Sequence, residues 1–207
     1  MKTLLAVPAV LLFSIALVSC GTGQERSAAT TKASSSVPAD VAKSTKDLDQ
    51  VQAGLKNLQN AGDNPDLKKM YGDLKSEANH LVGSLEDVRS HSDSAIAAGR
   101  KQIEQWHKDA DGFTDPDLRT SSNKREGDLR AAVDALAASS ATLTTASDSY
   151  RSSLSQTLKA LDLDLSKPGL ESVQPVVAKL VNDEPNLRTS LKDVSEKSQS
   201  LNGVINP

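Results

Sequence analysis

Apolar residues recur at every seventh position along most of this chain, and this repeat constrains the fold more than any other feature. A second apolar series runs beside the first at spacings of three and four, which places both on one stripe of an α-helix. A single helix cannot bury such a stripe, so the helices must pack on one another as in a coiled coil. The first series contains Val41, Leu48, Leu55; Leu67, Leu74, Leu81, Val88, Ala95; Leu129, Leu136, Leu143, Tyr150; and Val173, Leu180, Leu187, Val194, Leu201.

Three clusters of turn-forming residues divide this repeat. Each offers a capping side chain just before a proline, at Asn64–Pro65, Asp115–Pro116 and Ser166–Pro168. Pro185 lies inside the last stretch and is expected to kink or interrupt its helix near Asp183. The pattern predicts helices over about residues 39–60, 65–110, 116–163 and 168–203.

The connections between these helices are short, which makes neighbouring helices antiparallel. At 1.5 Å per residue, the second and third helices would each be about 65–70 Å long. The expected fold class is therefore all-α, an elongated antiparallel bundle of three to four helices with coiled-coil-like packing. The sequence leaves open whether the 39–60 helix joins this bundle, and whether a second copy of the chain completes the apolar stripes.

The N-terminus has the pattern of a bacterial lipoprotein signal peptide over residues 1–19. Lys2 precedes an apolar run, Leu4–Val18, which is shorter than the roughly 20 residues that cross a bilayer. The run ends in a lipobox, Leu17–Cys20, so Cys20 is the predicted site of lipid attachment. Its thiol would take up a diacylglyceryl group, and its amino group, freed by cleavage, an acyl chain such as palmitate. The alternative is an uncleaved membrane anchor with a free thiol.

Residues 20–37 are rich in Ser, Thr and Ala and show no apolar period. Such a segment predicts a flexible tether with a reach of roughly 20 Å, followed by a helical domain over residues 38–207. Gly21 stands where an aspartate would favour the inner membrane, so we expect a lipid-anchored protein of the outer membrane that faces the periplasm. The chain has one cysteine and therefore no internal disulfide.

Composition excludes several classes of function. The 24 Lys and Arg are interspersed with 27 Asp and Glu, without the basic stripe of a nucleic-acid-binding protein. The sequence has no glycine-rich phosphate loop, no nucleophile elbow and no carboxylate pair placed for acid–base work, so no enzymatic activity and no catalytic residue is expected.

The histidines are the only candidates for a metal site. Glu77–His80 and Glu104–His107 have the spacing found in di-iron bundles. The two pairs lie on one helix, about 40 Å apart, and cannot share a metal. We interpret both as surface neighbours, with Asp87 and His91 as a third such pair, and expect neither a metal nor a cofactor beyond the covalent lipid. A metal-binding bundle is the remote alternative.

Trp106 is the most distinctive side chain, on the second apolar series near a predicted turn. It would either plug the core where two helices meet or anchor a partner, since Trp and Arg often dominate interfaces. Arg119 and Arg125, across the turn, would share that contact or form ion pairs. The acidic residues expected within their reach are Glu104, Asp109 and Asp111.

The region around this turn is similar to a bacterial family, the domain-of-unknown-function family 2959 (DUF 2959). The similarity rests on Trp106, Leu118, Arg119, Ser122 and Arg125, followed by Leu158, Leu161 and Leu165. It implies a long helical envelope protein and assigns no activity.

Together these features predict a membrane-anchored envelope lipoprotein that binds or spaces another envelope component without catalysis. Its partners would be the membrane, through the lipid, and an envelope protein or cell-wall component. The alternative is a carrier that binds a lipid or another hydrophobic ligand between its helices.

Overall fold

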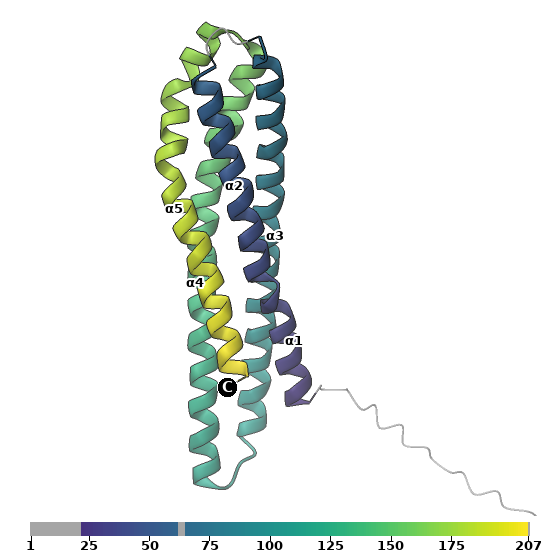
Figure 1. Ribbon diagram of the computed structural model, residues 1–207. Helices are drawn as coiled ribbons and strands as arrows, with labels where there is room; N and C mark the ends of the chain where they lie inside the picture. The colour runs from purple at the N-terminus through teal and green to yellow at the C-terminus, as the bar shows by residue number, and fades with distance from the viewer. Residues whose placement is uncertain (1–21, 62–64, 207) are drawn as a thin grey trace, which may run out of the picture.

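The computed structural model describes residues 22–61 and 65–206, which contain helices and no strand. The all-α prediction is confirmed, and the molecule is a long rod (Figure 1). Its helices are α1 (Gly23–Ser35), α2 (Val37–Gln59), α3 (Leu67–Ala110), α4 (Pro116–Leu163) and α5 (Lys167–Ile205).

Helices α2 to α5 form a four-membered ring in which each helix packs on the next and α5 returns to pack on α2. The question that the sequence left open is thereby answered, because α2, the predicted 39–60 helix, is a full member of the bundle. The shorter α1 lies against α3 and α5 at the end of the rod that carries the α3–α4 turn.

The apolar series occupies the centre of this ring, as the heptad spacing predicts. Leu48, Leu81, Leu136 and Leu180, one from each long helix, have no exposed surface. Of the first series only Leu67 is partly exposed, at the α2–α3 end of the rod. Small residues of the second series bring helices together.

Helices α3 and α4 pack closely at Gly99 of α3. A Cβ at this position would lie 2.5 Å from Cγ2 of Val133 on α4. Only a glycine leaves room for this valine, whose side chain is rigid because it is β-branched within a helix.

The predicted helix starts are confirmed at two of three positions. The Asp115 carboxylate accepts hydrogen bonds from the backbone N–H groups of Asp117 and Leu118 at 2.9 and 3.0 Å, and Pro116 is the first residue of α4. Ser166 caps α5 in the same way. The prediction at Pro65 was wrong, since α3 begins at Leu67, and Asn64 lies outside the described residues.

Of the two outcomes predicted at Pro185, a kink or an interruption, the interruption was wrong, because α5 continues through Pro185 and through Pro175. Both prolines lie on the exposed face of the helix, where a carbonyl that loses its N–H partner can bond to water. On the opposite face Leu180 and Leu187 are buried in the bundle and hold the backbone in register on either side of Pro185.

The prediction of a flexible tether over residues 20–37 was wrong for its described part, since Gly23–Ser35 is helix α1. Thr22 and Glu25 form a capping box at its start, and the helix docks on the bundle. The docking face is polar: Thr30 and Ser34 are fully buried, although neither is apolar. Thr30 Oγ1 donates to Gln102 Oε1 at 2.8 Å, and Ser198 Oγ donates to the Ser34 carbonyl at 2.7 Å. Hydrogen bonds therefore hold α1 on the bundle, in place of the buried apolar stripe by which the heptad pattern identifies a packed helix.

Candidate functional site

The structure brings Trp106 and Arg125 together beside the α3–α4 turn. Trp106 Nε1 donates a hydrogen bond to Ser122 Oγ at 2.8 Å, and the Arg125 guanidinium lies 5.4 Å from the centre of the indole ring. Arg119 is not part of this pair: it donates to the carbonyl of Phe113 at 2.8 Å and fastens the turn. Trp106 is half-buried and packs against the edge of the core, so it is both a core residue and accessible from outside.

The ion pairs that the sequence suggested for these arginines were wrong. Asp109 instead pairs with Arg26 of α1 at 2.6 Å, and Glu104 pairs with Lys108 one turn along its own helix at 2.7 Å. The Lys108 ammonium lowers the pKa of the exposed Glu104 carboxyl through a hydrogen bond. The α1 segment, which the sequence analysis treated as a tether, thus supplies the partner of Asp109.

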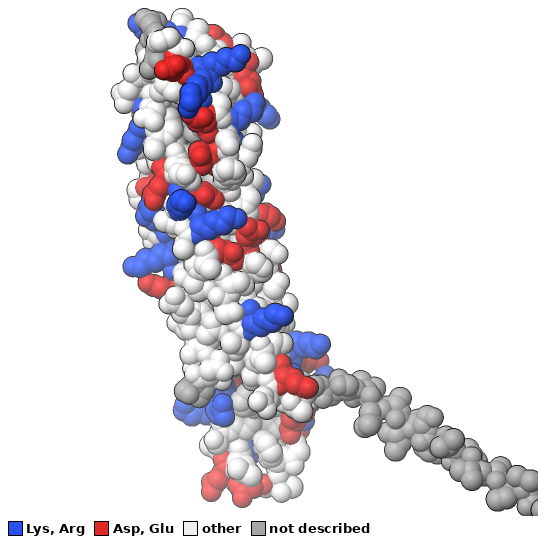
Figure 2. Space-filling model, turned by 45° about the vertical axis from the view of Figure 1, so that its right-hand side comes forward, with Lys and Arg blue, Asp and Glu red and all other residues white. Residues whose placement is uncertain are grey.

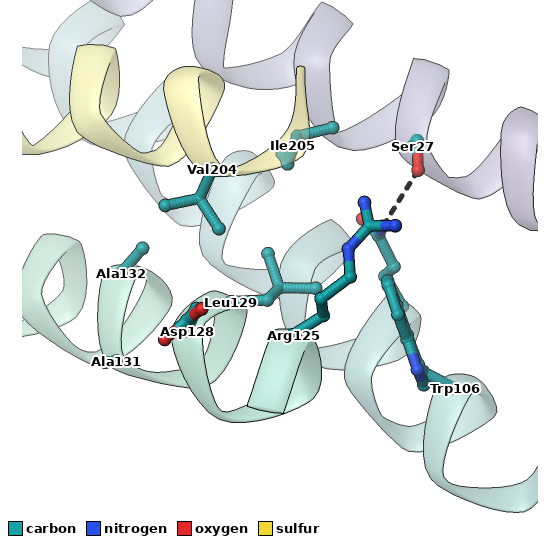
Figure 3. Close-up of a pocket in the computed structure, with 10 residues that line it drawn as sticks. Ser27, Trp106, Arg125, Asp128, Leu129, Ala131, Ala132, Val204 and Ile205 are labelled. Carbon is teal, nitrogen blue, oxygen red and sulfur yellow. Dashed lines mark hydrogen bonds between the residues drawn. The ribbon is translucent and has the colours of Figure 1, made fainter. Parts of the chain in front are cut away.

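Trp106 and Arg125 line two adjoining hollows of about 500 and 460 Å³, and Figure 3 shows the residues around the first. Both share walls made by Ser27 of α1 and Gln102 of α3, and Gln102 Nε2 donates to Ser27 Oγ at 3.0 Å. The first hollow adds apolar side chains from α4 and the last turn of α5: Leu129, Ala132, Val204 and Ile205. The second opens toward the turn and adds, among others, Gly23, Phe113 and Leu118.

The hollows exist because two helices end before the other two. α5 stops at Ile205, and α1 begins only at Gly23, whereas α3 and α4 continue to their connecting turn (Figure 1). Over this last stretch two helices must cover a core that four helices cover elsewhere. We call residues 109–118 the tip; they form the last turn of α3, the connection and the first residues of α4.

The tip carries two exposed apolar side chains: Phe113, which no sequence pattern singled out, and Leu118, which was named only as part of the family resemblance. Phe113 is 38% exposed and Leu118 59% exposed, and among the described residues the only other large exposed hydrophobic side chain is Leu163, at the opposite end of the rod. Both residues lie in a ten-residue segment with four aspartates, a pattern that is visible in the sequence. A heptad repeat does not detect it, because the segment falls between two helices.

The histidines make separate side-chain contacts. His80 Nδ1 lies 3.5 Å from Glu77 Oε2, as the interpretation of surface neighbours predicted. The other two pairings were wrong: His91 contacts Asp40 of α2 at 2.6 Å, and His107 contacts Glu126 of α4 at 3.4 Å. Within residues 22–61 and 65–206 no cluster of three His, Cys, Asp or Glu side chains is placed to hold a metal ion.

A buried polar contact lies inside the ring, far from the tip. Gln52 Nε2 donates to the Tyr150 hydroxyl at 3.0 Å and to the Leu180 carbonyl at 3.3 Å. Burial raises the pKa of Tyr150 well above its ordinary range, so this phenol stays protonated under physiological conditions. The contact joins α2, α4 and α5 and has the features of a structural link.

Cys20, the predicted lipid-attachment residue, lies outside the described residues. Among the described helices, none is long and apolar enough to span a bilayer. A scan against protein-family models found no match for the chain, so the resemblance to DUF 2959 stays a prediction. A search of curated protein sequences found no match either.

Proposed function

We propose that the chain is a bacterial envelope lipoprotein that acts without catalysis, as a rigid helical spacer between its membrane and an envelope partner. The observation that carries this proposal is the position of α1. The helix starts at Gly23, three residues after the predicted lipidated Cys20, and it docks beside the tip. A lipid at Cys20 would therefore hold this end of the rod at the membrane.

The length of the rod supports a spacing role. Helix α3 has 44 residues, which corresponds to about 66 Å at 1.5 Å per residue. The α2–α3 and α4–α5 connections lie together at the end away from α1, where a partner would be met (Figure 1). The buried apolar series runs along the whole ring, so the described bundle is packed continuously and keeps its two ends at a fixed distance.

The surface of the half away from α1 fits a protein or cell-wall partner. Charges of both signs are intermingled there (Figure 2). Lys75 and Asp162 pair at 2.9 Å across α3 and α4, and Arg188 and Asp49 pair at 2.5 Å across α5 and α2. Exposed pairs of this kind add little stability, but they suit specific, salt-sensitive recognition.

A carrier of a lipid or another hydrophobic ligand is the second candidate, and the hollows beside Trp106 favour it. Their walls combine aliphatic side chains with a few charged ones: Arg125 in both, Asp128 in the first, and Arg26 and Asp109 in the second. An apolar lining with a small number of polar groups is typical of small-molecule sites.

Three measurements test the proposal. Mass spectrometry of the membrane-extracted protein should show residues 1–19 removed and Cys20 diacylated and N-acylated, whereas Cys20→Ser should leave the protein unlipidated and extractable without detergent. Gly21→Asp, which leaves the lipidation site intact, should shift the protein from the outer to the inner membrane. A protein with its leader attached and no lipid would contradict the anchor.

The partner is found by crosslinking in cells with a photoreactive residue at Leu163, compared with one at Trp106. Recovery of an envelope protein or cell-wall fragment at Leu163 supports the spacer. Co-purified lipid crosslinked only at Trp106 would favour the carrier instead.

A further inference from the structure

We propose that the tip is a second membrane contact, in which Phe113 and Leu118 enter the interface of a zwitterionic bilayer and hold the rod end-on. This inference rests on the proposed lipid at Cys20. It adds a lipid-binding surface at a place where the anchor alone would leave the orientation of the rod free.

The connection between the anchor and the helix is short. Gly23 is three residue steps from Cys20, and at about 3.3–3.6 Å per step these span about 10–11 Å at most. Gly23 itself lines the hollow that contains Phe113 and Leu118. A lipid on Cys20 therefore lies in the immediate neighbourhood of the tip whenever α1 is docked.

The tip protrudes at one end of the rod. The turn between α3 and α4 lies beyond both the start of α1 and the end of α5 (Figure 1). Arg26, one turn into α1, pairs with Asp109 at the very end of α3, which fixes α1 beside the base of the tip. A bilayer that holds the lipid on so short a connection meets the protruding tip first.

The tip presents apolar side chains to solvent. Phe113 is 38% and Leu118 59% exposed, and both line the second hollow. The backbone at both positions is held in place, because Arg119 donates to the Phe113 carbonyl and the Leu118 N–H donates to Asp115. An apolar pair beside a covalent lipid adds a second membrane-binding signal to the anchor.

The charge of the tip selects the kind of bilayer. Residues 109–118 contain four aspartates and no lysine or arginine, and acidic side chains gather at this end of the molecule (Figure 2). Asp109 is paired with Arg26, whereas Asp111 and Asp117 remain exposed beside Phe113 and Leu118. An anionic surface would repel these carboxylates, so the contact suits phosphatidylcholine or phosphatidylethanolamine.

The test uses tryptophan fluorescence in the lipidated, full-length protein, because Trp106 is the only tryptophan of the chain. Trp106→Phe removes the native signal, and Phe113→Trp or Leu163→Trp then places one tryptophan at the tip or at the opposite end. Each variant is reconstituted in phosphatidylcholine vesicles with acyl chains brominated near the glycerol. The tip reporter should be strongly quenched, and the Leu163→Trp reporter should keep its full emission.

Vesicle flotation separates the two proposals. A protein that does not float with the vesicles lacks the anchor, and the proposed function fails with it. A protein that floats while its tip reporter is unquenched, or while both reporters are quenched equally, overturns the end-on contact alone.

A second measurement avoids the substituted tryptophan. In the lipidated native protein, the backbone amides of Asp111–Thr114 should exchange hydrogen more slowly on vesicles than in the Cys20→Ser protein. Substituting serine for both Phe113 and Leu118 should lower the ratio of membrane-bound to free tips about tenfold or more, because the apolar area that is buried in the bilayer is lost. Equal exchange on and off vesicles would overturn the contact even if the tryptophan variants failed to fold.

Discussion

Gln102→Ala is expected to undock α1 and leave the four-helix ring folded. The Gln102 side chain is 3% exposed and is the centre of the polar contact between α1 and α3. It accepts a hydrogen bond from Thr30 and donates one to Ser27, so its removal breaks two links between these helices at once.

The size of the effect follows from these two bonds. Each neutral hydrogen bond contributes about 1 kcal/mol net, so docking of α1 should weaken by about 2 kcal/mol. At about 1.4 kcal/mol per tenfold, this corresponds to a roughly 30-fold rise in the undocked population. The melting temperature of the ring should not change, because α1 can unfold locally and most of its contacts are separate from the apolar core of the ring.

Native-state hydrogen exchange measures this change directly. Amides of Gly23–Ser35 should lose about 30-fold of their protection, whereas amides of α2 and of the middle of α3 should not change. Gln156→Ala is the matched control, since Gln156 is an exposed glutamine of α4 whose side chain bonds to Ser152 one turn earlier on the same helix. Unchanged α1 protection in Gln102→Ala, or an equal loss in Gln156→Ala, would refute the role of the polar contact between α1 and α3.

Three further predictions concern packing, pH and the tryptophan. Gly99→Ala adds a methyl 2.5 Å from a buried valine and should lower the free energy of unfolding, measured by thermal denaturation, by about 1–3 kcal/mol. Gly83→Ala is the control: a Cβ there has nothing within 4 Å, so this change should stabilise the protein by up to about 1 kcal/mol. Equal melting temperatures for the two variants would contradict the close packing at Gly99. Burial raises the pKa of Tyr150 above its unfolded value near 10, so the stability that the protonated phenol contributes is full below about pH 10 and is lost as pH rises through the folded pKa. In urea unfolding across this range, the free energy of unfolding should fall less steeply with pH for Tyr150→Phe than for the native protein. An equally steep fall in both proteins would contradict this. Arg125→Ala should expose the indole ring, which shifts the fluorescence emission of Trp106 to the red and increases its quenching by acrylamide. The loss of the cation–π contact should lower the free energy of unfolding by about 0.5–1 kcal/mol. An unchanged spectrum would show that the arginine does not cover the ring.

The long helices were predictable because apolar side chains mark them. Leu48, Leu81, Leu136 and Leu180 stand at heptad positions and are buried where that spacing places them. The site was predictable only in part. Trp106 and Arg125 do meet at the turn, but the hollows beside them depend on where α1 starts and α5 ends, which no local pattern specifies.

Helix α1 escaped prediction for a physical reason. Its buried face consists of hydroxyl groups, and hydrophobic periodicity cannot detect a helix that docks through Thr30 and Ser34. The local signal was present in Thr22 and Glu25, which form a capping box. Pro185 did not interrupt α5, although a proline inside a helix often does, because it lies on the solvent-exposed face and buried leucines pack on both sides of it.

The ring places the long helices in the same order in space as along the chain. Most contacts among the ring helices therefore join consecutive helices, whereas the packing of α5 on α2 and on α1 closes long loops. Chains with such local topology fold rapidly, because little loop-closure entropy is lost before contacts form. A chain that emerges N-terminus first can assemble α2 with α3 and then α4 in sequence, and the arrival of α5 completes the barrel of helices in a single late step.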